Sequence, residues 1–386
     1  MKGISGCEHG SAYELSLDDL SRALPPALSY SPLVIPLSRS NTNPKPDDKY
    51  RKEKIEAKAE TVTLLRRDLY DARYQLISES EASSVDVSSA TSVPKGATSA
   101  ERPETLDYIN NPSDLIPGVY EGGLKTWECS LDLVDYLANV SDPREDWVRG
   151  KRIIELGCGT AVPNLYLLHT LFSNPQRASS DADKLSTEIV LQDFNDLVLR
   201  LVTFPNVLLQ WYASPLAEEY RLQHPPEDEV VFSPDTPGDM HITPQLISAF
   251  HTSLQEQGIA ICFIAGSWQS LSDSDIRGAF PLDITLTSET IYETSSLPSL
   301  IALLKRCTQG EAKDVRDVDN TTTQTSDLVI EGSARLCLIA AKVLYFGVGG
   351  SVMEFERAIT KAGGKTTTVL DRQAGVERKV MSIAWT

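Results

Sequence analysis

A strand-like segment that runs into a glycine turn is the part of the sequence best suited to chemistry. Residues 153–156 (Ile-Ile-Glu-Leu) predict a buried strand, and Gly157-Cys158-Gly159-Thr160 predicts a turn before a helix. Glycines let the backbone approach a ligand, and the helix N-terminus offers unpaired N–H groups. The pattern lacks the third glycine of a dinucleotide fingerprint. It favours S-adenosylmethionine (AdoMet), whose cationic end suits the Glu155 carboxylate, over a turn with a purely structural role.

The next two predicted strands also end in residues that can bind this ligand. Gln192 and Asp193 follow the second strand, and a carboxylate there can accept hydrogen bonds from both ribose hydroxyls, or else cap the next helix. Gly266-Ser267-Trp268 follows the third strand, where backbone N–H groups and an indole can flank adenine, or else Trp268 packs in the core. Because ligands of open α/β sheets bind at the carboxyl ends of strands, we expect one shared site.

Two further segments are expected to close this site. Residues 287–292 (Thr-Ser-Glu-Thr-Ile-Tyr) are polar at the end of an apolar strand, where the sulfonium methyl of AdoMet would meet its acceptor; helix capping by Ser288 or Thr290 is the alternative. Residues 118–129 are dense in glycine, aromatic and acidic residues and predict a lid over the cofactor.

Strand and helix patterns alternate from residue 106 onward. This alternation predicts an α/β, Rossmann-like fold with seven strands, a mostly parallel sheet and an antiparallel C-terminal edge hairpin. The expected strands are residues 152–156, 188–192, 259–265, 282–287, 336–343, 365–370 and 379–385. The expected helices are residues 163–171, 196–202, 244–255, 297–306 and 353–362, with a capping helix before residue 140. Insertions are expected at about residues 172–187, 213–258 and 308–333.

The first 105 residues predict a largely disordered region. Proline- and serine-rich stretches surround a charged, helix-prone segment at about residues 47–77, which has a plausible apolar docking face. The methyltransferase domain is expected at residues 106–386. We expect residues 1 to about 45 and 79–105 to be dispensable for cofactor binding.

Composition restricts the class of partner. The net charge of −18 argues against a direct nucleic-acid binder and suits a basic protein partner, although solubility alone can also explain it. The 6 cysteines are scattered through the chain, the 5 histidines have no ligand spacing, and we expect no metal site. Without a signal peptide pattern or a long apolar run, we expect a soluble monomer in the cytoplasm and nucleus, with no membrane contact.

Five blocks in order resemble the eukaryotic protein-histidine N-methyltransferases of the methyltransferase-like class, from about residue 114 to the C-terminus. The blocks are residues 117–125 with Trp127, Glu128 and Cys129, then residues 155–160, 192–195, 286–292, and 340–342 with 345–350. The resemblance implies AdoMet as the cofactor and a histidine of the large-subunit ribosomal protein uL3 as the substrate. The cofactor contacts that it implies are Thr126, Trp127, Glu128, Cys129, Ser130, Gly157, Gln192, Asp193, Phe194, Gly266, Ser267, Trp268 and Ser288, beside Glu155 and Gly159 of the glycine turn. Ser267 departs from the family, which usually has an acid there.

Methyl transfer to imidazole makes modest demands on the protein. A neutral imidazole nitrogen is nucleophilic near pH 7, so the enzyme must select the tautomer and align the ring. A carboxylate that accepts the other ring N–H would do both and stabilise the imidazolium. Glu289 is the candidate for this catalytic role, and Tyr292 is a weaker one. A protein-lysine methyltransferase of the same fold and a non-catalytic AdoMet-binding chaperone or scaffold for a ribosomal protein remain as alternatives.

Overall fold

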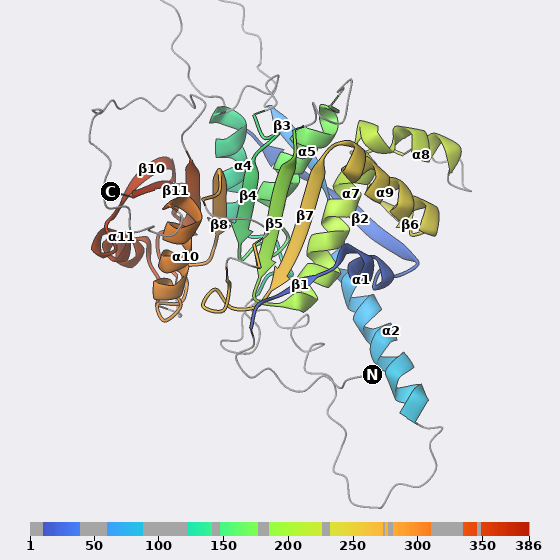
Figure 1. The fold of residues 1–386 in the computed structure, drawn as a ribbon, viewed down its shortest axis with the longest axis horizontal. Helices are drawn as coiled ribbons and strands as arrows, with labels where there is room; N and C mark the ends of the chain where they lie inside the picture. The colour runs from blue at the N-terminus through green and yellow to red at the C-terminus, as the bar shows by residue number, and fades with distance from the viewer. Residues whose placement is uncertain are drawn as a thin grey trace, which may run out of the picture.

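One large twisted sheet organises the protein (Figure 1). The computed structural model describes residues 11–38, 60–87, 122–140, 147–176, 185–225, 232–272, 275–276, 281–309, 335–345 and 349–385. Within these residues the sheet has 8 strands in the order β1-β7-β5-β4-β8-β9-β11-β10. The strands are β1 Tyr13–Leu15, β4 Arg152–Leu156, β5 Thr187–Asp193, β7 Ile259–Ala265, β8 Ile284–Ser288, β9 Leu336–Lys342, β10 Gly364–Arg372 and β11 Arg378–Trp385.

The pairing of these strands confirms the predicted fold class. Strands β7, β5, β4, β8 and β9 are mutually parallel, whereas β11 runs antiparallel to both β9 and β10 at the C-terminal edge. The strand order reverses at β4, where β5 lies on one side and β8 on the other. The crevice outside the carboxyl ends of β4 and β8 is therefore the expected ligand site of the sheet. Strand β1, which pairs antiparallel with β7, was not predicted.

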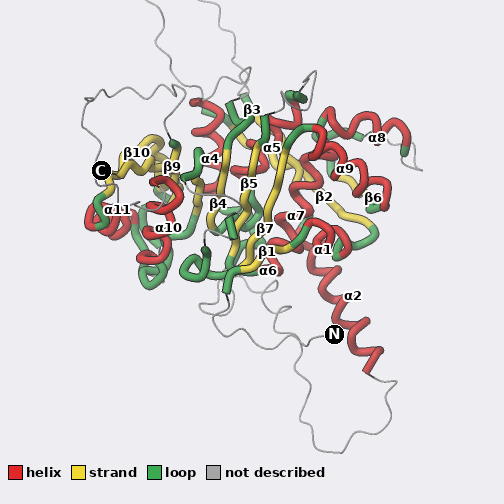
Figure 2. Tube along the Cα trace, in the orientation of Figure 1, coloured by secondary structure: helices red, strands yellow, loops and turns green. Residues whose placement is uncertain are grey.

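Helices cover both faces of the sheet, as the tube view also shows (Figure 2). Successive strand residues such as Ile153 and Ile154 are both buried, but they belong to core clusters on opposite faces of the sheet. A strand buried on both faces reads as a continuous apolar run, which is how it was recognised in the sequence. The first face carries α4 Glu128–Val140, α5 Val162–Ser173, α7 Phe204–Ala213 and α9 Pro244–Glu256. The second carries α10 Leu297–Gln309 and α11 Val352–Lys361.

The N-terminal region is more ordered than predicted. It contains α1 Leu17–Arg22, β2 Ala27–Pro36, β3 Thr61–Arg67 and α2 Leu69–Val87 in addition to β1. The predicted helix over residues 47–77 is wrong at residues 61–67, which form a strand, whereas residues 69–77 are helical as part of α2. The β-branched residues Thr61, Val62 and Thr63 favour a strand, and the register places Leu64 opposite Leu33 of β2. Residues 47–59 lie outside the described residues.

The largest predicted insertion, residues 213–258, also folds. It contains β6 Gly238–His241, which pairs with β2 and completes a second sheet of order β3-β2-β6, and it contains the short helix α8 Glu218–Gln223 and α9. The insertion therefore joins the described N-terminal residues, 11–38 and 60–87, to the main domain. The other two predicted insertions lie mostly outside the described residues, at 177–184 and 310–333.

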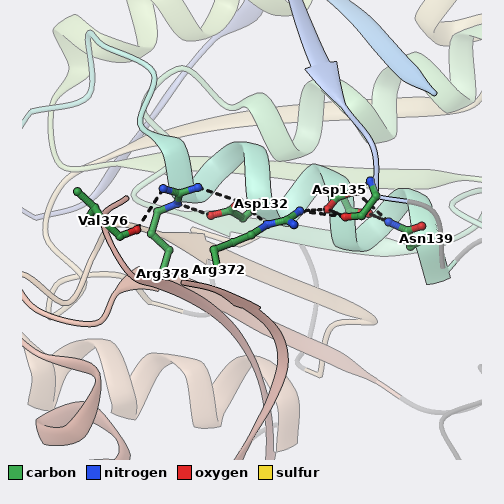
Figure 3. A network of polar contacts seen from close by, with 7 residues as sticks. Asp132, Asp135, Asn139, Arg372, Val376 and Arg378 are labelled. Carbon is green, nitrogen blue, oxygen red and sulfur yellow. Dashed lines mark hydrogen bonds and ion pairs between the residues drawn. The ribbon is translucent and has the colours of Figure 1, made fainter. Parts of the chain in front are cut away.

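An ionic network fastens helix α4 to the C-terminal hairpin (Figure 3). Arg378 Nε lies 2.6 Å from an oxygen of Asp132, and Arg372 pairs with both Asp132 and Asp135. Asp135 also accepts hydrogen bonds from the N–H and hydroxyl of Ser38. Because Asp132 and Asp135 are buried, these pairs are what makes their charge tolerable at this position.

The described residues contain neither a membrane-spanning helix nor a cluster of metal-binding side chains. No described helix combines the length and apolar character needed to cross a membrane. No group of three or more histidine, cysteine, aspartate or glutamate side chains in the described ranges is placed to hold a metal ion. Five cysteines are buried free thiols, namely Cys129, Cys158, Cys262, Cys307 and Cys337.

Candidate active site

The glycine turn after β4 lies close to the loop after β8 and to the segment around Gly123. Gly157 and Gly159 have φ of 61° and 51°, in the left-handed region that favours glycine. A Cβ on Gly157 would lie 2.7 Å from Cγ2 of Thr290, and one on Gly159 would lie 3.2 Å from the backbone of Gly123. A side chain at either position would be crowded by these neighbours, so glycine lets Thr290 and Gly123 pack directly against the turn at the carboxyl end of β4.

Gln192 ties this turn to the loop after β7. Its Oε1 accepts hydrogen bonds from Gly157 N at 3.2 Å and from Trp268 Nε1 at 2.9 Å. Its Nε2 donates to the carbonyl of Gly266 at 2.7 Å. The side chain is fully buried. The structure thus brings together four residues that were predicted from three separate loops, with Gln192 at their centre.

Asp193 also holds the glycine turn. One of its oxygens accepts from Gly159 N at 2.9 Å and the other accepts from Asn195 N at 3.0 Å. Each carboxylate oxygen can accept a second hydrogen bond, so contact with ribose hydroxyls stays compatible with these bonds. The neighbouring Phe194 is exposed, which leaves its ring free to cover a bound adenine. Contact of either residue with the cofactor stays a prediction.

Glu155 lies deeper than the sequence suggests. It is fully buried, and its Oε2 accepts hydrogen bonds from the side-chain and backbone nitrogens of Asn164 in helix α5. Burial raises the pKa of Glu155 to about 8, Asn164 opposes this shift, and Asp193 adds to it. A carboxylate in this position organises the start of α5 behind the turn. The expected direct contact with the cationic end of AdoMet stays a prediction.

The other predicted residues after β7 and β8 lie at the same end of the sheet. Ser267 makes hydrogen bonds with Ser270, which shape the turn that presents Trp268. Ser288 ends β8 opposite Ala340 of the neighbouring strand. Ser267 and Ser288 are both partly exposed, so they remain accessible to a ligand.

The predicted lid, where it is described, covers the glycine turn. Gly123 packs against Gly159, and the hydroxyls of Thr126 and Thr160 lie 3.2 Å apart. Leu124 is buried in a cluster that includes Leu76 of helix α2. The N-terminal helix therefore packs beside the lid through Leu76, while its Tyr70 and Tyr74 are exposed. Residues 118–121 lie outside the described residues.

A π-helical turn, which sequence reasoning missed, supports the glycine turn from behind. The π-helix η2 Leu199–Thr203 continues α6 Asp196–Val198 into α7. Thr203 Oγ1 donates to the carbonyl of Gly159 at 2.6 Å, and Asn206 Nδ2 donates to the carbonyl of Thr160 at 3.1 Å. Such π-turns are frequent at functional sites. Only the polar residues inside an apolar helix, Thr203 and Asn206, could have signalled this role.

Glu289 occupies an unusual position at the end of β8. Its φ of 56° makes it one of two non-glycine residues with positive φ in the described part of the chain, the other being Ala161 at the start of α5. Its N–H donates to the carbonyl of Ala340 at 2.9 Å, which fixes the turn. A long side chain in this region of φ is strained, and such strain is concentrated at functional sites.

Donor groups surround the Glu289 carboxylate. Lys342 Nζ lies 3.4 Å from Glu289 Oε1, and the Cys129 thiol and the Tyr345 hydroxyl lie near enough for the charge of Glu289 to act on both. Burial, reinforced by the charge of Glu289, raises the pKa of both Cys129 and Tyr345, so both remain protonated donors. Tyr292, the weaker candidate, packs edge-on against Tyr345 with ring centroids 6.5 Å apart.

The start of helix α4 completes this end of the site. Trp127 is 38% exposed, and its carbonyl accepts a hydrogen bond from Ser130 Oγ at 2.6 Å. Glu128 Oε2 lies 3.5 Å from Lys342 Nζ, and that ammonium also lies 4.3 Å from the centroid of the Trp127 ring. Every residue predicted to bind cofactor or act in catalysis thus lies in the described part of the chain, around the carboxyl ends of β4, β5, β7 and β8.

These residues fit AdoMet. The acceptor oxygens of Asp193 suit the ribose hydroxyls, and the first turn of α5, where Asn164 N already pairs with Glu155, presents the positive end of the helix dipole to the carboxylate of this ligand. Trp268 and Phe194 lie at the same end of the sheet, and their contact with adenine stays a prediction.

Comparison with known proteins identifies the family. No protein-family model matches the chain. It is 32% identical over 299 residues to histidine protein methyltransferase 1 of Saccharomyces cerevisiae, an alignment that covers 76% of this chain and 67% of the yeast protein. The chain belongs to the histidine protein methyltransferase family. The member from Schizosaccharomyces pombe is 29% identical over 78% of this chain and 69% of its own length. The mouse homologue is 28% identical, over 72% of this chain and 60% of its own length.

Membership of this family confirms the predicted class of enzyme, a protein methyltransferase with AdoMet as methyl donor. Among solved structures, magnesium protoporphyrin IX methyltransferase from Synechocystis with bound SAH aligns with a TM-score of 0.34 and 6% identity, over 67% of this chain and 83% of that one. At that TM-score it adds nothing to the assignment, which rests on the strand order and the sequence relatives.

Proposed function

We propose that this protein methylates an imidazole nitrogen of a histidine in the large-subunit ribosomal protein uL3. The observation that carries the proposal is the Glu289 carboxylate, which the left-handed turn and the ion pair with Lys342 place at the carboxyl end of β8, near Cys129 and Tyr345. Family membership supports histidine as the acceptor, and the resemblance of the sequence blocks supports uL3.

In this reaction the residues of the chain must select the tautomer of the acceptor ring and stabilise the imidazolium that forms. Bound AdoMet supplies an electrophilic methyl group on its sulfonium sulfur. The imidazole lone pair forms the new N–C bond while the S–C bond breaks, and the ring afterwards loses the proton on its other nitrogen. Glu289 accepts a hydrogen bond from that N–H, which selects the tautomer and stabilises the imidazolium as it forms. Its Oε1 makes no hydrogen bond within the described residues, where it lies buried beside Lys342 Nζ.

The donors around Glu289 then act as a frame. Tyr345 and Cys129 keep the carboxylate in one orientation, since both hydroxyl and thiol stay protonated. A fixed carboxylate aligns the ring without a reorganisation cost during the reaction.

Charge supports a basic protein as the partner. At −18 the chain should attract a cationic ribosomal protein and repel nucleic acid, and the attraction should weaken with salt. We propose that the enzyme acts as a monomer, without direct contact with nucleic acid or membrane, in the cytoplasm and nucleus, where ribosomal proteins are made and assembled.

The test uses purified full chain, AdoMet with a labelled methyl group, and purified uL3. The proposal expects one labelled histidine in uL3 by mass spectrometry, and no label when that histidine is replaced by alanine. Label on a lysine would instead indicate a lysine methyltransferase of the same fold. AdoMet binding without any label would indicate a scaffold.

A further inference from the structure

The ammonium group of Lys342 fills a space built for a cation. Lys342 is the last residue of β9, and its side chain is only 15% exposed. Its Nζ lies 3.4 Å from Glu289 Oε1, 3.5 Å from Glu128 Oε2 and 4.3 Å from the centroid of the Trp127 ring. An aromatic face flanked by carboxylates is the arrangement by which proteins hold ammonium groups.

This space lies where the acceptor is expected. Glu289 immediately follows β8, and Lys342 ends the adjacent parallel strand β9 two residues beyond Ala340, whose carbonyl binds Glu289 N. Glu128 and Trp127 lie at the start of α4, at the end of the lid. The chain therefore places its own cation beside the carboxylate that faces the acceptor.

We propose that Lys342 is a specificity-determining residue that excludes protonated amines, such as lysine side chains, from the acceptor site. The inference rests on the proposed function, in which Glu289 meets the acceptor. A lysine acceptor enters as a cation and would be repelled by the resident ammonium, whereas a neutral imidazole would not. The repulsion acts in a site partly shielded from water, where charges interact more strongly than in solution.

The charges around Lys342 make the expected change clear. Glu128 and Glu289 face its ammonium directly, and the nearby Arg378 and Asp132 pair with each other at 2.6 Å. The formal charges of Glu128, Glu289 and Lys342 sum to −1. Without the lysine charge they sum to −2, and the face of the Trp127 indole is uncovered. Replacement of Lys342 by a neutral residue would therefore remove the local repulsion by its ammonium group and increase the negative charge that an incoming ammonium group meets.

The experiment compares two peptides that differ only in the acceptor. One carries the histidine that the wild-type enzyme methylates, with its flanking sequence, and the other has lysine at that position. The ratio of kcat/KM for lysine to that for histidine is measured for wild type, Lys342→Met, Lys342→Gln and Lys342→Arg. Lys305→Met is the matched control, because Lys305 also lies over an indole, 5.7 Å from the centroid of Trp385, but far from this site on helix α10.

We expect both neutral variants to raise the lysine-to-histidine ratio by about tenfold or more, which corresponds to about 1.4 kcal/mol of discrimination. Lys342→Arg and Lys305→Met should leave the ratio within about twofold of wild type, the arginine variant because it keeps the charge. Binding of both peptides in the presence of S-adenosylhomocysteine should show the same change, even if a variant turns over slowly.

Three other outcomes would each overturn part of the proposal. A wild-type enzyme that methylates no histidine would overturn the proposed function. A wild-type enzyme that methylates histidine, with neutral variants whose ratio and peptide binding are unchanged, would overturn only the role of Lys342. An equal shift in Lys342→Arg and Lys342→Met would also overturn it, because the effect would not follow charge.

Discussion

The backbone N–H of Arg67 donates a hydrogen bond to Asn206 Oδ1 at 2.7 Å, and this bond joins the N-terminal sheet to the cofactor site. The same Asn206 donates through Nδ2 to the carbonyl of Thr160 in the glycine turn. Arg67 also donates to the carbonyl of Leu201 in the π-helical turn and pairs with Asp71 of α2. Strand β3 is therefore part of the wall behind the cofactor.

Loss of this connection should weaken cofactor binding. Asn206→Leu, which keeps the branched shape of the side chain, removes both hydrogen bonds, and we expect AdoMet affinity to fall about fivefold or more and stability by about 1–3 kcal/mol. Asn174→Leu is the control, because Asn174 follows the other end of α5 and its side chain donates only to Thr170 in that helix. Calorimetry that shows unchanged affinity for Asn206→Leu would contradict this role.

The same connection changes the expectation for truncation. A chain that starts at residue 106 lacks β1, β2, β3 and α2, which pair with β7 and β6 and cover buried Leu124 and Val198. We expect such a chain to lose AdoMet binding or to fail to fold, contrary to the prediction that much of this region is dispensable. A truncated chain that bound AdoMet as tightly as the full chain would show that the wall is not required.

Asp193 should matter for affinity through its charge. In Asp193→Asn one carboxylate oxygen becomes an NH₂ donor, which cannot accept from Gly159 N or Asn195 N and would leave fewer acceptors for ribose. We expect a loss of about 1.5–3 kcal/mol in AdoMet binding, the scale of hydrogen bonds to charged groups. Asp196→Asn, an exposed carboxylate in the first turn of α6, is the matched control and should bind like wild type. Equal affinities for the two variants would remove the assignment.

The sheet was easier to predict than the N-terminal region, for physical reasons. Strands such as β4 are buried on both faces and read as uninterrupted apolar runs, and each ends in the polar residues that parallel strands bring to one edge. Strand β2, which pairs with β3 on one side, pairs on the other with β6, which lies about 210 residues further along the chain. No local pattern specifies a partner at that separation.

Within the site, the sequence indicated which residues gather but not what each one binds. The loops after β4, β5 and β7 were expected to converge, and Gln192 joins them. Glu155 was expected to face the ligand, yet it accepts hydrogen bonds from Asn164. Side-chain direction at the end of a strand depends on the helix packed behind it, and single-sequence patterns do not contain that information.

Glu155 should make stability depend on pH. Its native pKa of about 8 lies above the usual pKa of 4.5 for this side chain, so between these pH values the native state holds a proton that the unfolded state has lost. This contribution to stability is complete at low pH and is lost as pH rises toward 8. Glu155→Gln lacks it, so the unfolding free energy of the variant relative to wild type should increase from pH 5 to pH 8. Urea unfolding at several pH values measures this difference, and a constant or decreasing difference would contradict the assignment.

The network in Figure 3 should contribute to stability through Asp135. Its side chain is nearly fully buried and pairs with Arg372, which is about one-third exposed. We expect Asp135→Asn to cost about 2–3 kcal/mol, somewhat less than the loss of a partner from a fully buried pair. Glu188→Gln is the control, because the Arg152–Glu188 pair is more exposed and should be worth about 1 kcal/mol or less. A cost for Asp135→Asn as small as that of the control would show that the hairpin is held by its apolar contacts alone.

The most direct test of the account is the identity of the methylated atom and its dependence on Glu289. Full-length wild type and Glu289→Gln are incubated with labelled AdoMet and uL3, AdoMet affinity is measured for both, and the label is mapped by fragmentation mass spectrometry. The account predicts label on an imidazole nitrogen, with a fall of about a hundredfold in turnover for Glu289→Gln and an AdoMet affinity within about twofold of wild type. Label on a lysine, or equal turnover in the two proteins, would contradict it.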